Sequence, residues 1–445
     1  MRSVGPLSLI VGIALLPMAV ALQNPKPARA FEDLSPVAVE EIPAIPNDDA
    51  PPADDAAPRG PTRLLGGARD LTVPHRHPVD TRTYEALKGR AARDRAAPEG
   101  GLPAPLNRDL VPTVVTSFAG LDRPGAANNG LEFFPPDTIV AKSTTRVLEA
   151  ANSALRLFAT SGGVLQTRDL NAFFGVSFDN GFVFDPKVYF DRNASNRRFY
   201  VVALQSDFFN TSRILLAVSR GPDPANLNAT NWCRYNIDGR RNVGGSNASF
   251  ADYPGLGAGA DALVISTNQF RFLDDLFTFA IVRAIRKIPL ANNAATCPAL
   301  QMFTFQATQT IDDDAAFTLQ PAQHYTNPSS FMGTTNPAYL VSTRFGSSTT
   351  YRLWQLRNVG GSPPTLRFTN VSGPSYGIQP DAPQRGSDLL LATGDNRMTQ
   401  AAGSGNAVSG VHGTVCQFGG GPNESCIRLV RFVAGQSAGG ALMAS

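Results

Sequence analysis

Apolar runs recur along most of the chain and alternate with polar or glycine-bearing turns. Five such runs end in similar hairpin signals and start about 60 to 75 residues apart, at 154–163, 212–221, 277–287, 350–361 and 426–435. Each follows a second β-rich run, at 146–153, 198–206, 261–270, 338–345 and 407–415. Val, Ile, Tyr, Phe and Thr dominate these runs, and Gly, Asn, Asp and Pro bound them, as is typical of strands. The repeat therefore predicts one β-meander per unit.

This period indicates an all-β fold, a β-propeller of about five four-stranded blades, with six or seven blades as alternatives. In the second unit the strands are expected at 187–190, 198–204, 213–219 and 232–237, ordered from the channel outward. No fourth strand is recognisable after 426–435. We expect residues 111–118 to close the ring from the N-terminal side, the alternative being a truncated propeller.

Composition agrees with this fold class. The chain has 40 Gly, 35 Pro and 27 Phe, and 17% of its residues are charged, against about 25% in ordinary domains. These values favour many turns and aromatic-rich strands over helical bundles. The formal net charge is +3 and both signs are spread along the chain, so we expect no nucleic-acid partner.

The N-terminal quarter differs from the rest. Residues 1–21 resemble a signal peptide, with Arg2, an apolar run and a small-residue cleavage site. We expect a secreted, periplasmic or cell-surface protein, and no later segment is long and apolar enough to span a membrane. Residues 22–105 are rich in Pro, Ala and Asp without an apolar period, which predicts a disordered linker or pro-segment before a propeller at 106–445. His75 and His77 within it are expected to be solvated polar residues rather than metal ligands.

Four cysteines suit an oxidising compartment and disulfides. Three pairings are open. We favour Cys416 with Cys426 across one short loop, which leaves Cys233 with Cys297.

Acidic residues recur at the entrance of the innermost strand. They are Asp137, Asp185, Asp252 and Asp395, whereas His324 is the nearest ionisable group in the fourth unit. In an antiparallel meander, the loop entering the first strand and the loop leaving the second lie on one face. We therefore expect these residues around one channel mouth, together with Asn268 and Arg344 from the ends of second strands.

Several chemistries fit such a ring. Carboxylates suit Ca²⁺, they suit a polyhydroxylated ligand, and a pair of them suits glycoside hydrolysis. Equally, an Asp before a Pro or a strand often only fixes a turn through backbone hydrogen bonds. The chain has no G-x-S-x-G, HExxH or P-loop sequence, so the familiar hydrolase, zinc-protease and nucleotide signatures are missing.

Several segments carry a resemblance to a known family. They are PPDT at 135–138, FFGV at 173–176, FDPKVYFDR at 184–192, ILLAVSRGPDPANLNATNW at 214–232 and FADYPGLGAGADALVISTNQF at 250–270. Over about residues 130–415 the chain resembles a family of exported, mostly uncharacterised bacterial β-propeller proteins. The resemblance implies a propeller, sometimes compared with sialidase-like folds, and implies no catalytic residues.

Two function classes follow. The first is an exported binding module for a glycan or a surface protein at the channel mouth, and the alternative is a glycoside hydrolase that uses a pair of the four aspartates. We favour binding, because no arginine recurs at a fixed position in the units to hold a substrate carboxylate. The sequence predicts no oligomeric state.

Overall fold

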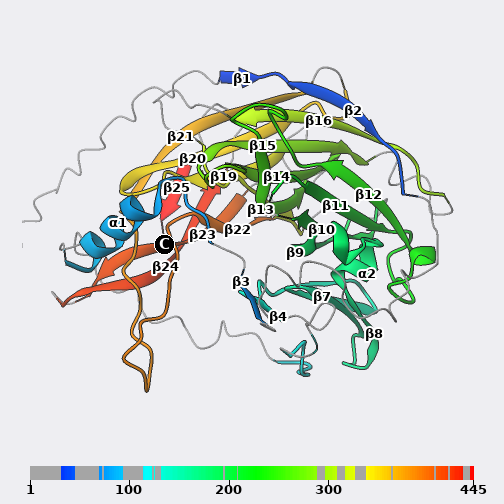
Figure 1. The fold of residues 1–445 in the computed structure, drawn as a ribbon, viewed down its shortest axis with the longest axis horizontal. Helices are drawn as coiled ribbons and strands as arrows, with labels where there is room; N and C mark the ends of the chain where they lie inside the picture. The colour runs from blue at the N-terminus through cyan, green and yellow to red at the C-terminus, as the bar shows by residue number, and fades with distance from the viewer. Residues whose placement is uncertain are drawn as a thin grey trace, which may run out of the picture.

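The structure, a computed structural model, describes residues 32–45, 70–72, 75–93, 114–122, 125, 132–193, 196–207, 209–287, 296–307, 316–325, 337–361, 364–404, 407–418, 421–433 and 441–444. Within these ranges the chain is all-β with few helices, and five antiparallel meanders stand side by side (Figure 1). The prediction of a five-bladed propeller is confirmed.

The first three blades follow the chain in order from the channel outward. Blade 1 comprises β5 (Ile139–Lys142), β6 (Arg146–Ala151), β7 (Ala154–Ala159) and β8 (Val164–Asp169). Blade 2 comprises β9 (Phe182–Asp191), β10 (Arg198–Ser206), β11 (Ser212–Ser219) and β12 (Trp232–Asp238). Blade 3 comprises β13 (Ser249–Ala258), β14 (Ala262–Arg271), β15 (Phe277–Arg286) and β16 (Leu300–Ala307). Short helices α2 (Leu170–Phe174), η3 (Phe178–Asn180) and η4 (Ala229–Asn231) connect strands in this half.

The last two blades share an interrupted inner strand. Blade 4 comprises β17 (Gln320–Pro321), β19 (Ala338–Thr343), β20 (Ser348–Arg357) and β21 (Thr365–Tyr376). Immediately after β17 the chain crosses to blade 5, where β18 (Gln323–His324) pairs in parallel with β22 (Met398–Ser404). Blade 5 continues with β23 (Ala407–Gln417), β24 (Asn423–Val433) and β25 (Ala441–Ala444). Residues 320–324 therefore tie the two blades together.

Two glycines allow this crossing segment to approach blade 3. A Cβ at Gly257 would lie 2.5 Å from the Ala322 carbonyl oxygen, and a Cβ at Gly255 would lie 2.5 Å from Pro321. Both glycines lie inside β13, so they serve close backbone packing between inner strands.

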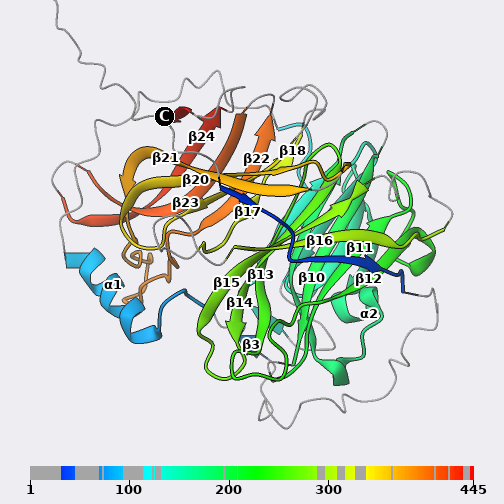
Figure 2. The same ribbon diagram turned by 90° about the horizontal axis from the view of Figure 1, so that it is seen from above.

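The segment expected to be a linker contributes strands where it is described. β1 (Glu32–Leu34) adds to the outer edge of blade 4, and β2 (Ala38–Ile42) adds to the outer edge of blade 3. Figure 1 shows β1 and β2, in blue, along the outer rim of the sheets, and Figure 2 shows the same strands from above. An edge strand forms backbone hydrogen bonds with the strand that it covers and needs no strong apolar period of its own. The composition of this segment therefore did not predict β1 and β2. β3 (Asp70–Thr72) pairs with β4 (Glu132–Phe134), and α1 (Thr81–Arg93) follows.

Four hydrophobic clusters fill the interfaces between successive blades, from blades 1 and 2 to blades 4 and 5. Each contains side chains from two neighbouring sheets, and Trp232 and Trp354 are fully buried in two of them. Burial of this kind contributes about 25 cal/mol per Å² of apolar surface and dominates the stability of the ring. Blade 5 gains its outer strand from β25, while the described residues 114–118 form no strand, so the closing strand expected at 111–118 is not seen in its described part.

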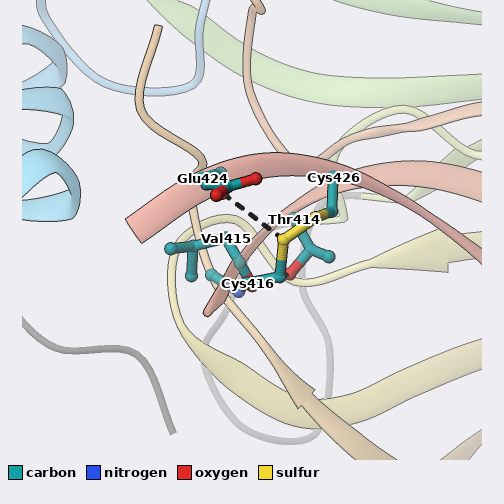
Figure 3. The surroundings of a disulfide bond; sticks show 6 residues. Thr414, Val415, Cys416, Glu424 and Cys426 are labelled. Carbon is teal, nitrogen blue, oxygen red and sulfur yellow. Dashed lines mark hydrogen bonds between the residues drawn. A yellow bond between two sulfur atoms is a disulfide. The ribbon is translucent and has the colours of Figure 1, made fainter. Parts of the chain in front are cut away.

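Both disulfide pairings are as predicted. Cys233 on β12 joins Cys297, with the two Cα atoms 5.3 Å apart, and Cys416 on β23 joins Cys426 on β24, with Cα atoms 6.0 Å apart. Figure 3 shows the second bond, where Cys416 also approaches the carbonyl oxygen of Glu424. Disulfides of this kind persist in oxidising compartments. The predicted signal peptide lies outside the described residues, and within the described ranges no helix is long and apolar enough to cross a membrane.

Candidate functional site at one mouth of the channel

The four predicted aspartates lie at one end of the inner strands, here called the aspartate mouth. Asp137 precedes β5, Asp185 and Asp252 lie early in β9 and β13, and Asp395 precedes β22. The electrostatic neighbours agree: the charges of Asp137, Asp185 and Asp395 all reach the ring of Tyr253. The structure therefore brings these four residues together from blades 1, 2, 3 and 5.

A left-handed residue marks the same place in every blade. It is Asp137 (φ 41°), Asp185 (φ 52°), Tyr253 (φ 50°), Thr318 (φ 51°) and Gly394 (φ 67°) in blades 1 to 5. In blades 2 and 3 it forms a β-bulge before a proline, where the register against the second strand shifts. Asp252 precedes this position by one residue and Asp395 follows it by one. The four aspartates are thus not equivalent, and this offset gives them different partners.

Asp137 and Asp185 lie next to each other and share a hydrogen bond. Asp185 is only 7% exposed. Burial raises the pKa of Asp185 well above its ordinary value, and the charges of Asp137 and Asp252 raise it further. Burial also raises the pKa of Asp137, against the opposing charge of Lys187. When it is protonated, the Asp185 carboxyl can donate a hydrogen bond to the Asp137 carboxylate.

Asp395 has the opposite environment. Arg397 binds it through Nε at 2.7 Å and Nη2 at 2.6 Å, and His77 Nδ1 lies 2.8 Å from the second oxygen. Burial alone would raise the pKa of Asp395, but the charge and hydrogen bonds of Arg397 lower it far below its ordinary value. This carboxylate is fully ionised and fully paired.

Asp252 is also paired, through a residue of the N-terminal segment. Arg76 lies 3.4 Å from Asp252 and 3.2 Å from Asp275, and its guanidinium lies over the ring of Phe250 at 4.8 Å. Only the second carboxylate is substantially exposed. Arg76 therefore neutralises Asp252 within the mouth.

Residues 75–93, here called the cap segment, cover part of the aspartate mouth. His77 stacks on Tyr84 with ring centres 3.5 Å apart, and the Tyr84 hydroxyl donates to the Gly394 carbonyl. Lys88 on α1 donates to the carbonyls of Gln379 and Gly394 and pairs with Asp381 at 2.7 Å. Sequence reasoning treated this segment as solvated. A single cation such as Arg76 gives no periodic pattern, so the sequence does not predict its contact with Asp252. The run His75-Arg76-His77 was the one local feature that could have suggested a functional role for this segment.

His75, His77 and Asp395 form a group that could hold a metal ion, with one donor atom of each residue within 4.8 Å of the others. Desolvation by the protein atoms packed around the His75 ring, followed by the charge of Arg397, lowers the pKa of His75 to about 3, although the residue keeps an exposed surface. The Asp395 carboxylate already accepts hydrogen bonds from Arg397 on both oxygens. A cation at this position would compete with that guanidinium.

Part of the mouth remains accessible, and we call it the mouth floor. It consists of the half-buried Asp137, Lys187 and Tyr253 and the exposed His75. Lys187 Nζ lies 5.6 Å from the centre of the Tyr253 ring, and the His75 ring meets Tyr253 edge-on. The Arg397 guanidinium also lies over the Tyr253 ring, 4.7 Å from its centre. A carboxylate, an ammonium and two rings thus lie close together at this end of the inner strands.

The remaining predicted residues are placed differently. Asn268 lies at this end, but its side chain accepts from the backbone of Thr318 and donates to the Thr318 hydroxyl, both at 2.8 Å. Arg344 also lies at this end, half-buried, and its backbone N–H donates to the Tyr376 hydroxyl.

His324 does not join the aspartates. It lies on β18 opposite Gly403, about eight residues along β22 from Asp395, which places it toward the other end of the channel. A buried Lys287–Asp191 ion pair lies near it, and burial followed by the Lys287 charge lowers its pKa to about 4. Thr318 holds the fourth entrance position instead.

Comparison with known proteins gives a limited set of relatives. No protein-family model matches the chain, and no curated protein matches it. Among solved structures it is similar to the α-L-arabinanase of Cellvibrio cellulosa complexed with arabinohexaose, with 13% identity and a TM-score of 0.27 over 69% of this chain and 94% of that one. It is also similar to the α-L-arabinofuranosidase of Lactobacillus brevis, with 10% identity and a TM-score of 0.27 over 66% and 90%. At these TM-scores the likenesses carry no inference about the activity of this chain.

Proposed function

We propose that the chain is an exported binding module that takes a glycan at the aspartate mouth. The observation that supports it best is the mouth floor, where the partly exposed Lys187 and His75 both lie against the Tyr253 ring, and Asp137 is close enough for its charge to act on Lys187 and Tyr253. Ligand sites commonly combine aromatic walls with a few convergent polar groups. A sugar ring offers apolar faces to the rings and hydroxyl groups to Asp137 and Lys187.

The proton of the buried Asp185 supports a ligand rich in hydroxyl groups. With that proton donated to Asp137, the pair carries one negative charge rather than two. Lys187 lies beside this single negative charge, so the ligand need not carry a positive charge. A hydroxyl group can donate to Asp137, and this favours neutral polyols over cationic ligands.

Binding is favoured over hydrolysis by the spacing of the carboxyl groups. Two-carboxylate glycoside hydrolysis needs separations of roughly 5 to 9.5 Å, whereas Asp137 and Asp185 are in hydrogen-bond contact. Asp252 and Asp395 are held by Arg76 and Arg397. A hydrolase that pairs Asp137 with another of the four remains the second candidate, because Asp185 supplies a carboxyl with a raised pKa, as an acid catalyst requires.

Two further proposals concern ligand and location. Ca²⁺ could replace the proton shared by Asp137 and Asp185, since carboxylate oxygens are its usual ligands. A surface protein is the alternative partner to a glycan.

The disulfides and the N-terminal sequence support the proposal that the protein is exported. Sequencing of the N-terminus of the secreted or periplasmic protein should find cleavage after Ala21, and an intact N-terminus in the cytoplasm would contradict it.

The test is a glycan-array screen of the full chain, followed by calorimetric titration of the best ligand. We expect micromolar binding that Asp137→Asn weakens at least about tenfold, because a lost charge-assisted hydrogen bond costs about 1.5 to 3 kcal/mol. The exposed Asp388→Asn, in the loop between the paired residues Ala382 and Leu391, is the matched control and should bind like the wild type.

The outcomes separate the candidates. Release of reducing sugar from the bound glycan would favour the hydrolase, and a heat of Ca²⁺ binding lost in Asp137→Asn would favour the ion. An array without any ligand, or equal affinity for Asp137→Asn and the wild type, would overturn the proposed site.

A further inference from the structure

A pocket opens at the end of the inner strands opposite the aspartate mouth. Its volume is about 370 Å³, and it is lined by Lys142, Ser143, Thr144, Phe190, Arg192 and Arg197, here called the basic pocket. Lys142 ends β5, and Arg192 directly follows β9. Asp137 and Asp185 lie five and seven residues earlier on the same inner strands, which is about 17 to 23 Å away at 3.3 Å per residue. The basic pocket is therefore separate from the aspartate mouth.

Its three cations are uncompensated within the described residues. Lys142, Arg192 and Arg197 are exposed, and none of them forms an ion pair with a described carboxylate. Lys142 Nζ donates to the Ser143 carbonyl, and Arg192 lies over the Tyr325 ring at 5.5 Å. Three like charges around one concave space repel one another unless an anion joins them.

The nearby acidic groups are already engaged. Asp191 is buried and pairs with Lys287 at 2.5 Å, and it also accepts from Asn196. Asp223 accepts from the Ser143 hydroxyl at 2.5 Å and from the backbone of Thr145 at 3.1 Å. These two carboxylates organise the turns that carry the cations and leave the positive charge facing the pocket.

The remaining lining is suited to a sugar rather than to a bare ion. Phe190 supplies an apolar wall, the Thr144 side chain is exposed at the rim, and Tyr325 stands beside Arg192. A volume of about 370 Å³ falls in the range of small-molecule sites, roughly 300 to 1,000 Å³. Arginine binds carboxylate and sulfate groups in a bidentate manner.

We propose that the basic pocket binds an acidic saccharide, a uronate or sulfated sugar unit, whose oxyanion is held by Arg192, Arg197 and Lys142. This site is independent of the glycan proposed for the aspartate mouth. No repeating sequence pattern predicts this pocket, because the three cations lie on or beside the first turns of blades 1 and 2 and come together only through the packing of the two blades.

Calorimetric titration of the full chain tests the proposal with three probes: a heparin-derived tetrasaccharide, the neutral cellotetraose, and inorganic phosphate. We expect the acidic tetrasaccharide to bind and cellotetraose not to bind at this site. The double variant Arg192→Gln/Arg197→Gln should weaken the acidic tetrasaccharide at least about 100-fold, at about tenfold for each charge-assisted contact.

A matched control guards against nonspecific attraction of a polyanion to a basic protein. Arg385→Gln removes an exposed arginine from another loop and should leave the affinity within about twofold, since an exposed charge outside the contact acts only through screened attraction. All variants change exposed side chains, and unchanged melting temperatures will show that they fold.

Three results would overturn the proposal. One is an unchanged affinity of the double variant for the acidic tetrasaccharide. The second is an equal loss of affinity in Arg385→Gln. The third is tighter binding of inorganic phosphate than of the tetrasaccharide at the same residues, which would make the pocket a site for a small free oxyanion.

Discussion

The aspartate mouth has two halves that use the same residue type in opposite ways. On blades 1 and 2, Asp137 and Asp185 face each other and share a hydrogen bond, with Lys187 as the nearest cation. On blade 5, Asp395 is enclosed by Arg397 and His77. Burial raises the pKa of Asp185, whereas Arg397 lowers that of Asp395 despite equal burial.

The difference follows from one residue of offset. Asp137 and Asp185 occupy the left-handed position itself, so their side chains point at neighbours of the same kind. In blade 5 that position is Gly394, and Asp395 is turned toward Arg397 two residues later. Aspartates that recur at the entrances of different blades therefore do not all have the same role. Blade 5 is the paired half, in which an arginine neutralises the carboxylate, and this half stabilises the fold. Blades 1 and 2 form the unpaired half, in which Asp137 and Asp185 have no arginine partner among the described residues, and this is the half that we propose for a ligand.

The largest effect should come from breaking the paired half. Asp395→Asn leaves Arg397 buried without its carboxylate, and loss of one partner of a buried ion pair costs about 3 to 5 kcal/mol. Urea unfolding measures the loss. The exposed Asp388→Asn serves as its control and should stay within about 0.5 kcal/mol of the wild type. A loss below about 1 kcal/mol for Asp395→Asn would contradict this role.

A smaller loss is expected for Arg76→Met. Asp252 then remains buried and unpaired, but the ion pair is longer, at 3.4 Å, and solvent screens the bond to Asp275. We expect about 2 to 3 kcal/mol and faster proteolysis of the cap segment. The exposed Arg82→Met on α1 is the matched control. Cleavage at the wild-type rate would show that Arg76 does not hold the segment.

The unpaired half should respond to pH with the opposite sign. The raised pKa of Asp185 means that its contribution to stability is present below the unfolded value of about 4 and is lost as pH rises through the folded value. Asp185→Asn mimics the protonated form, so its free energy of unfolding should exceed that of the wild type by about 1 kcal/mol or more at pH 7, and equal it near pH 4.

The matched comparison is Asp395→Asn across the same pH range. Because the folded pKa of Asp395 is lowered, its stabilisation is present above the unfolded pKa and is lost as pH falls. Its deficit should therefore shrink toward acid pH. Parallel curves for the two variants would remove the distinction between the halves.

The smallest change in stability is expected for Asp137→Asn. Its side chain is half-buried and faces the accessible floor, so the free energy of unfolding should change by less than about 1 kcal/mol. Thermal denaturation checks this. A larger loss would place Asp137 with the structural residues and weaken the proposed binding role.

Much of the fold was readable from the sequence because blades repeat. The period of β-rich runs predicted five meanders, and in the second unit the expected strands coincide with β9 to β12. The aspartates were expected at one mouth because the first strand of each meander begins on the same face. Because the pattern recurs in five units, an error in predicting one unit does not change the predicted fold.

Other features had no repeating signal. The run at 323–328 suggested His324 as the fourth entrance residue, but the inner strand of blade 4 ends after Pro321 and crosses to blade 5, so the entrance lies earlier, at Thr318. β1 and β2 are single edge strands far from their blades in sequence. The cations of the basic pocket and Arg76 act through tertiary contacts alone.

The most direct test of the account is the titration of the aspartate carboxyl groups by carbon-13 NMR, with Asp137→Asn, Asp185→Asn and Asp395→Asn used to assign the signals. We predict that Asp185 titrates above the ordinary aspartate range and that its midpoint falls when Asp137 is replaced, while Asp395 stays ionised throughout the acid range in which the protein remains folded. Ordinary midpoints near 4 for both residues would contradict the division of the mouth into a paired and an unpaired half.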